Sequence, residues 1–339
     1  LPISQTEGLP EWLQTPLEST DLESSVSYYY LAARLINQRA VDVSGCPDGG
    51  LANSQVASEC GVAASQALLD EWQNTFNQDI LAASQTSGVP AQLLKNLFSK
   101  ESQFWPGIYH TYLEAGLGQM SEYGADTLLL WNPSFFTQFC PLVLDTEVCQ
   151  KGFGNLDQAE QEMLRGALVQ KVNAACPNCP MGIDLTQANF SISIFARSLL
   201  ANCEQVGQII YNITRQKAGE VSFYEDLWKF TLVNYNAGPG CLTNAIEQTY
   251  NHNLPLTWEN VIQFLEPACQ TSIDYVEDIS YMPEIILDDA TPTATPDVNQ
   301  APTPTPQPTA TPTPQSTPEP TSYPVDDGYP GYVPTQSYP

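Results

Sequence analysis

Proline recurs every few residues from about Asp289 to the C-terminal residue, first among Thr and Ala and then among Tyr and Gly. Proline has no backbone N–H and a fixed φ, so such a stretch cannot continue a helix or the interior of a sheet. We therefore expect residues 289–339 to be a disordered, Pro/Thr-rich tail of polyproline-II character. It would serve as an inert spacer or as a stalk through a cell envelope. Any packed core must then come from residues 1–288.

Upstream of the tail, apolar residues recur at helical spacing. In residues 65–84 they include Leu69, Trp72 and Phe76, which predicts one helix over that stretch. Similar patterns mark residues 24–40, 184–210 and 225–240. Residues 184–210 open with Asp184 and Gln187 at capping-box positions, and the helix within 225–240 is expected to stop at Gly238 and Pro239. Because strand alternation is hard to find anywhere, the fold class is predicted to be mainly α.

The sequence predicts that the chain is divided into three regions. Residues 1–66 resemble a helical N-terminal extension that packs onto the core. Residues 67–288 form the main domain, and residues 289–339 form the tail. Within the main domain, residues 131–183 hold four cysteines and are expected to be an irregular, disulfide-braced insertion around one short helix.

Nine cysteines indicate an oxidising compartment. Neighbours in sequence suit local disulfides, and the candidate pairs are Cys46 with Cys60, Cys140 with Cys149, Cys176 with Cys179, and Cys241 with Cys269. Cys203 is then left over, although sequence alone does not fix the connectivity. The Cys176–Cys179 pair could instead be a redox pair or half of a zinc site. No second CxxC exists and there are only two histidines, so we expect no metal site and no cofactor.

The acidic residues far outnumber the basic ones, 38 to 11, for a formal charge of −27. Such a surface repels phosphate backbones, which argues against nucleic acid as a partner. No apolar run is long enough to span a bilayer. The chain begins at Leu1, and with the cysteines this suggests an exported protein, extracellular or in the cell envelope, from which a signal peptide has been removed. We expect it to be a monomer.

Glu101 follows an apolar helical face. Leu94, Leu97 and Phe98 precede it by seven, four and three residues, so they share its side of the helix. A carboxyl in apolar surroundings has a raised pKa and can hold a proton near neutral pH, as a general acid must. By pattern alone, Glu101 could equally be a buried Glu that bonds backbone at a helix end.

Three separated segments resemble the lytic transglycosylase domain of the soluble, goose-lysozyme-like type. Residues 88–104 resemble its helix ending in a Glu-Ser pair, here Glu101 and Ser102. Residues 114–128 resemble its Gly-Leu-x-Gln motif, and residues 233–240 resemble its Tyr-Asn-x-Gly motif. Residues 184–200 and the Tyr275-Val276 pair add two weaker similarities. The resemblance covers roughly residues 67–280 and implies a lysozyme-like helical domain.

The resemblance also implies an activity. In this family one Glu protonates the bond between N-acetylmuramic acid (MurNAc) and N-acetylglucosamine (GlcNAc) of peptidoglycan. The same Glu then accepts a proton from the muramic 6-hydroxyl, which closes a 1,6-anhydro ring. Glu101 would be this residue, and the substrate-binding residues would be Ser102, Gln119, Tyr235 and Asn236. Tyr235 would position Glu101 through its hydroxyl, and Asn236 would anchor its turn.

Two alternatives remain. A goose-type lysozyme relative would admit water and hydrolyse the glycan, for which Glu114 or Glu122 could serve as a second carboxylate. A non-catalytic glycan-binding or surface structural protein could also have kept the fold. The chain departs from the family at Gly118, where a large residue is common, and at Asn234, where Ala is common.

Overall fold

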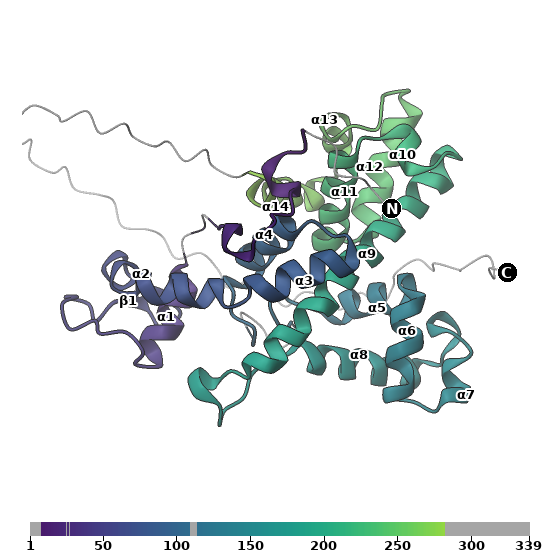
Figure 1. Ribbon diagram of the computed structural model, residues 1–339. Helices are drawn as coiled ribbons and strands as arrows, with labels where there is room; N and C mark the ends of the chain where they lie inside the picture. Colours follow the sequence, from purple (N-terminus) through teal and green to yellow (C-terminus); the bar gives the residue numbers. More distant parts are fainter. Residues whose placement is uncertain (1–7, 25, 27, 109–113, 282–339) are drawn as a thin grey trace, which may run out of the picture. The chain divides into compact units, whose positions relative to one another are not determined.

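The computed structural model describes residues 8–24, 26, 28–108 and 114–281, and these residues are mainly helical (Figure 1). The α-helices are α1 (Tyr29–Asn37), α2 (Glu59–Asn74), α3 (Asn77–Ser87), α4 (Ala91–Ser102), α5 (Glu122–Trp131), α6 (Pro133–Phe139), α7 (Thr146–Cys149), α8 (Gln158–Val172), α9 (Leu185–Thr214), α10 (Ala218–Val221), α11 (Tyr224–Ala237), α12 (Pro239–Asn251), α13 (Trp258–Val261) and α14 (Thr271–Ser280). Short 3₁₀ turns are η1 (Glu11–Leu13), η2 (Ser19–Asp21), η3 (Cys140–Leu142), η4 (Phe153–Asn155), η5 (Pro180–Gly182), η6 (Ile262–Phe264) and η7 (Pro267–Cys269). The prediction of a mainly α fold is confirmed.

The chain divides into a unit of residues 1–285 and a second unit of residues 286–339. The tail prediction itself falls outside the described residues. No helix in the described part of the chain is both long enough and apolar enough to cross a membrane.

The 30-residue helix α9 is the centre of the first unit. It contacts α3, α5, α8, α11 and α12, and Figure 1 shows it running between the group α5–α8 and the group α10–α12. Asp184 caps its first turn by accepting a hydrogen bond from the backbone N–H of Gln187 at 3.1 Å. The return bond of the expected capping box does not form, because Gln187 Nε2 donates to the carbonyl of Lys171 and the Asp184 N–H donates to the carbonyl of Ala174. Fully buried residues of α9, among them Ile192, Phe195 and Leu199, form the middle of the core.

The prediction of one continuous helix over residues 65–84 is wrong. The chain breaks at Thr75–Phe76 into α2 and α3, so one apolar periodicity covers two helices. The N-terminal extension is also less helical than predicted, because a two-stranded antiparallel sheet, β1 (Leu51–Asn53) with β2 (Val56–Ala57), lies inside it. Helix α2 begins at Glu59 and crosses the boundary expected at residue 66.

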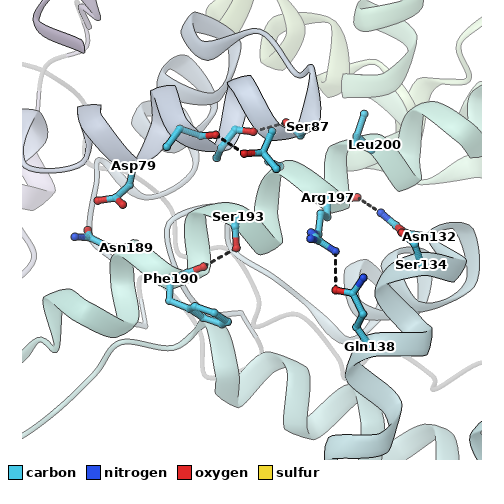
Figure 2. Close-up of a pocket in the computed structure, with 14 residues that line it drawn as sticks. Asp79, Ser87, Asn132, Ser134, Gln138, Asn189, Phe190, Ser193, Arg197 and Leu200 are labelled. Carbon is cyan, nitrogen blue, oxygen red and sulfur yellow. Dashed lines mark hydrogen bonds between the residues drawn. The ribbon is translucent and has the colours of Figure 1, made fainter. Parts of the chain in front are cut away.

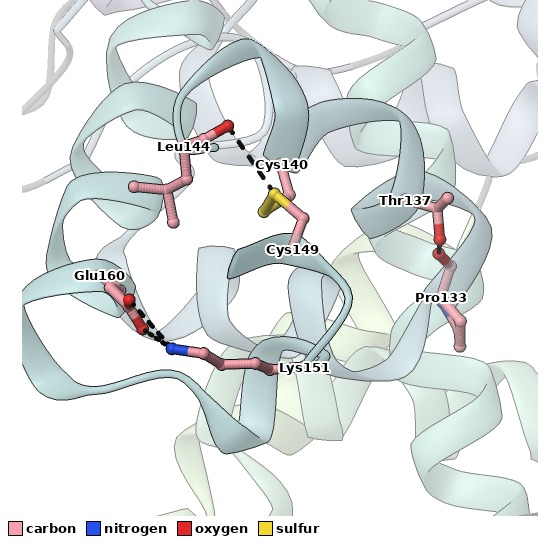
Figure 3. The surroundings of a disulfide bond; sticks show 7 residues. All are labelled: Pro133, Thr137, Cys140, Leu144, Cys149, Lys151 and Glu160. Carbon is pink, nitrogen blue, oxygen red and sulfur yellow. Dashed lines mark hydrogen bonds and ion pairs between the residues drawn. A yellow bond between two sulfur atoms is a disulfide. The ribbon is translucent and has the colours of Figure 1, made fainter. Parts of the chain in front are cut away.

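Residues 131–183 are more helical than predicted. Three α-helices lie there, and the longest, α8, starts with a capping box between Asp157 and Glu160. Leu164, Leu168 and Val172 are its buried face, which packs on α5 and α9. The Cys140–Cys149 disulfide closes the loop at α7, beside an ion pair of Lys151 with Glu160 (Figure 3).

All four candidate disulfides are confirmed. Cys46–Cys60, Cys140–Cys149, Cys176–Cys179 and Cys241–Cys269 are bonded, and Cys203 is a free thiol. The Cys176–Cys179 pair is therefore a disulfide in this structure, and its thiols are not zinc ligands here.

Lys95 on α4 is a charged residue with no exposed surface. Its Nζ donates to the backbone carbonyl of Gln73 at 3.0 Å and to Asn77 Oδ1, and lies 4.6 Å from the centroid of the Phe104 ring. Burial lowers the pKa of Lys95 from 10.5 to about 7, since desolvation penalises the ammonium.

We expect this lysine to make the stability of the fold depend on pH. The unfolded chain keeps the Lys95 proton up to about pH 10.5, whereas the folded chain loses it near pH 7, so the free energy of unfolding rises with pH in that window. The slope is at most ~1.4 kcal/mol per pH unit. Urea unfolding at pH 7.5 and pH 9 should show this rise in the wild type, and Lys95→Met should flatten it. An equal rise in both proteins would contradict the assignment.

Candidate active site

Glu101 lies in the last turn of α4, which ends in a left-handed turn at Gln103 and Phe104 with φ of 49° and 60°. The apolar face predicted beneath it is present, since Leu94, Leu97 and Phe98 are fully buried. Glu101 itself is partly exposed. The residue as a whole is therefore packed against protein without being fully buried.

The pKa of Glu101 is raised from 4.5 to about 7. Desolvation by the surrounding protein is the largest cause, and it is opposed by a hydrogen bond from Tyr275. The negative charge of Glu114 raises the pKa further, and Lys100 lowers it. The protonated form of this carboxyl is therefore far better populated near neutral pH than that of an ordinary glutamate.

The hydroxyl that positions Glu101 belongs to Tyr275, not to Tyr235. Tyr275 lies on α14 and donates its hydroxyl proton to Glu101 Oε1. Next to this contact, Lys100 of α4 forms an ion pair with Asp278 of α14. The role that the sequence assigned to the Tyr235 hydroxyl is thus taken by a residue 174 positions away from Glu101.

Tyr235 lies in the same centre but bonds elsewhere. Its hydroxyl donates to the backbone carbonyl of Gly118. Its pKa is raised well above 10 by burial and by the charges of Glu101 and Glu114, so it remains a neutral donor. The structure therefore brings together Glu101, Tyr235 and the Gly-Leu-x-Gln turn, as the motifs predicted.

Ser102 joins α4 to that turn. It is fully buried, and its hydroxyl lies 2.8 Å from the carbonyl of Leu117 and 3.2 Å from that of Phe98. A buried side chain bonded to two carbonyls cannot contact a substrate. The structure thus gives Ser102 a positioning role in place of the substrate contact predicted for it.

Gln119 is held in a left-handed conformation with φ of 49°. Its Nε2 donates to the carbonyl of Gly116 at 2.7 Å, which fixes the direction of the amide. Its Oε1 is buried and accepts no hydrogen bond within the described residues. Such an unpaired acceptor is uncommon, because the large majority of buried polar side-chain atoms have a hydrogen-bond partner.

Asn236 does not anchor its turn. It is exposed, and the structure shows no hydrogen bond from its side chain within the described ranges. The residue that ties α11 to α9 is Asn234, which is buried and donates to Asn202 Oδ1 at 2.7 Å and to Gln205 Oε1 at 2.8 Å. The departure of the sequence from Ala at position 234 thus adds a helix–helix contact.

Gly118 has no room for a larger residue. A Cβ placed there would lie 2.5 Å from Phe195 Cδ1 and 2.9 Å from the Tyr235 hydroxyl oxygen. Phe195 is fully buried on α9, so the ring cannot move away freely. The absence of a large residue at position 118 is therefore matched by the aromatic ring that α9 places against it.

We expect Gly118→Ala to destabilise the fold by about 1–3 kcal/mol, because overpacking forces Phe195 or the turn to shift. It should also disturb the Tyr235 hydroxyl. Gly166→Ala is the matched control, since nothing lies within 4 Å of a Cβ at that position on α8. Thermal unfolding of both variants decides the point, and equal melting temperatures would contradict it.

Glu114, which the sequence offered as a possible second carboxylate, lies close enough to Glu101 to act on its pKa. It precedes the Gly-Leu-x-Gln turn and is half-buried, and its charge raises the pKa of both Glu101 and Tyr235. The residues just before it, 109–113, lie outside the described ranges. Two pockets, one between α3, α6 and α9 and one beside Cys176, do not include Glu101 in their lining.

Within the described residues, no cluster of three or more His, Cys, Asp or Glu side chains could hold a metal ion. The chain was compared with protein-family models, with curated proteins and with solved structures, and none of them matches.

Proposed function

We propose that this chain cleaves the glycan strands of peptidoglycan as a lytic transglycosylase, with Glu101 as its catalytic residue. The observation that carries the proposal is the carboxyl of Glu101, which accepts a hydrogen bond from Tyr275 and whose pKa is raised to about 7, on a residue that is not fully buried. A group with this pKa can give and take a proton at neutral pH. The four disulfides are compatible with action outside the cytoplasm, which is part of the proposal.

The reaction needs two proton transfers at one carboxyl. In the first, protonated Glu101 donates its proton to the oxygen between MurNAc and GlcNAc, and the bond from that oxygen to the muramic C1 breaks. In the second, the Glu101 carboxylate accepts the proton of the muramic 6-hydroxyl, whose oxygen bonds to C1. The product is a 1,6-anhydro ring, and Glu101 is protonated again. No water is consumed.

The neighbours of Glu101 have separate roles in this scheme. Tyr275 donates a hydrogen bond to the carboxyl, which favours the carboxylate formed after the first transfer and limits the rise in pKa. Gln119 offers its free Oε1 to a sugar hydroxyl or acetamido N–H. Tyr235 and Ser102 hold the turn that carries Gln119, through Gly118 and Leu117.

Glu114 favours a second candidate function, hydrolysis. Its charge acts on Glu101, so two carboxyl groups belong to this centre. A glycosidase with two carboxyl groups uses one as the acid and the other as a nucleophile or as a base for water. In that case the product would carry a reducing end, and Glu114 would be as essential as Glu101.

Product analysis tests the proposal and separates the two candidates. Purified sacculi are digested with the wild type, Glu114→Gln and, as a control, the exposed Glu122→Gln. Mass spectrometry should find 1,6-anhydro-MurNAc ends from all three proteins. Reducing ends that disappear in Glu114→Gln would favour hydrolysis instead. Wild-type protein that binds sacculi and releases no fragments would overturn both.

A further inference from the structure

A pocket outside the Glu101 centre has the volume of a ligand site. It lies between α3, α6 and α9, has a volume of about 510 Å³ and is drawn in Figure 2. Small-molecule sites typically occupy about 300–1,000 Å³. None of the residues around Glu101 lines it, so the mechanism described above leaves it without a role.

Half of the residues that line the pocket have neutral polar side chains, and one has an aromatic ring. Phe190 is 53% exposed and projects beside the pocket (Figure 2), with Lys171 Nζ 4.9 Å from the centroid of its ring. The amide and hydroxyl groups are those of Thr86, Ser87, Asn132, Ser134, Gln138, Asn189 and Ser193. An aromatic face combined with many neutral donors and acceptors suits a sugar, because a sugar ring presents C–H groups on its face and hydroxyls at its edge.

Arg197 gives one end of the pocket a positive charge. Its guanidinium contacts Gln138 Oε1 at 3.5 Å and lies 6.0 Å from the Phe135 ring centroid, and within the described residues it forms no ion pair. The chain has 38 acidic residues and only 11 Lys and Arg. A guanidinium left without a carboxylate in such a chain is available to an anionic group, and its planar fork suits a carboxylate.

Asp79 and Asn189 lie together at the opposite end of the pocket (Figure 2). Asn189 Oδ1 is buried and accepts no hydrogen bond from any described residue. Burial raises the pKa of Asp79. This end therefore offers acceptors for hydroxyl or amide N–H groups, whereas the Arg197 end offers a donor.

We propose that this pocket is a second glycan site that binds an N-acetylated amino sugar carrying a carboxylate. Phe190 would lie against the sugar ring, Asp79 and Asn189 would accept from its hydroxyl and acetamido groups, and Arg197 would bind the carboxylate. The choice of a muramic acid rests on the proposed function, but binding at the pocket requires neither Glu101 nor cleavage. The pocket would hold a glycan strand while another part of the same strand is cut at Glu101.

The test is methyl NMR of the full chain with three probes. Leu200 lines the pocket and reports on it, whereas Leu117 reports on the Glu101 centre. The probes are the disaccharide GlcNAc–MurNAc with a free lactyl carboxylate, the neutral disaccharide GlcNAc–GlcNAc, and lactate alone. Neither disaccharide contains the MurNAc–GlcNAc bond that the enzyme would cut, so the wild type can be used.

We expect the acidic disaccharide to shift Leu200 and to bind more tightly than the neutral one. Arg197→Gln should weaken its binding at least tenfold and abolish the preference over the neutral sugar, because a charged hydrogen bond is lost. Phe190→Ala should weaken the binding of both disaccharides. The matched controls, Arg215→Gln at the end of the same helix and Phe223→Ala at another exposed ring, should change binding less than twofold.

Three results would overturn the proposal. Leu200 could fail to shift with the acidic disaccharide, Arg197→Gln could bind it as Arg215→Gln does, or lactate could reproduce the whole response, which would leave an anion site only. The proposed function fails separately, if sacculi stay intact. A Leu200 response with uncut sacculi would retain the glycan site and reject the enzyme.

Discussion

Glu101→Gln is expected to lower the rate of sacculus cleavage by at least ~10³-fold, since the amide has the shape of the acid but neither donates nor accepts the proton. General acid–base catalysis by a positioned side chain contributes typically ~10²–10⁴-fold, and here one residue would supply both transfers. The rate is measured as soluble fragments released per unit time. Glu122→Gln, at the exposed first turn of α5, is the control and should retain the wild-type rate.

Glu101→Gln should also be more stable than the wild type at alkaline pH. The pKa of Glu101 is about 7 in the folded chain and near 4.5 in an unfolded one, so the folded state binds more protons between these values. The free energy of unfolding therefore falls as pH rises from 4.5 to 7, and Gln abolishes this loss. We expect a gain of ~1–3 kcal/mol at pH 8 and little gain at pH 4, with part of the shift discounted because Glu101 is partly exposed. For the cleavage prediction, a Glu101→Gln variant that cleaves sacculi at the wild-type rate would contradict the catalytic role of Glu101.

Removal of the Cys241–Cys269 disulfide is expected to have the largest effect on stability. It closes a 28-residue loop, for which the entropy of the unfolded chain predicts a loss of about 3–4 kcal/mol in the double Ala variant. For a unit of 285 residues the loss corresponds to a melting temperature about 5–7 °C lower. Differential scanning calorimetry measures it.

This disulfide should also affect the site. Cys269 ends η7 directly before α14, the helix that carries Tyr275, and Cys241 lies in the first turn of α12. Loss of the bond frees the start of α14 and should weaken the Tyr275–Glu101 contact. The rate of sacculus cleavage should therefore fall even at temperatures below the melting temperature of the variant. The Cys140–Cys149 pair is the control, because it closes a 9-residue loop in the region of α7. Its removal should cost stability and leave the rate unchanged. Equal rates for the two double variants would contradict the link.

The helical fold was readable because it depends on local features. Apolar periodicity marked α9 and α11, and Asp184 and Gly238 marked their ends. The cysteine pairs were also readable, since each disulfide joins near neighbours in sequence. The break at Thr75–Phe76 was not, because both helices bury residues of the same apolar face and no Gly or Pro separates them.

The site was readable only in part. The apolar face below Glu101 follows from helical spacing, and the turn at Gln119 from its glycines. The partner of Glu101 comes from α14, and nothing near Tyr275 in sequence distinguishes a hydroxyl that contacts a carboxyl from one that packs in a core. The burial of Ser102 and the lack of space at Gly118 depend on Leu117 and Phe195, so they required the tertiary packing.

Titration of the Glu101 carboxyl shows directly whether its pKa is raised to the range that a general acid and base needs. The carboxyl carbon is observed by ¹³C NMR in uniformly labelled protein and assigned by its absence in Glu101→Gln. We expect a midpoint near pH 7, which moves upward in Tyr275→Phe because the hydrogen bond that stabilises the carboxylate is lost. A midpoint near 4.5, the value of an ordinary solvated Glu, would contradict it.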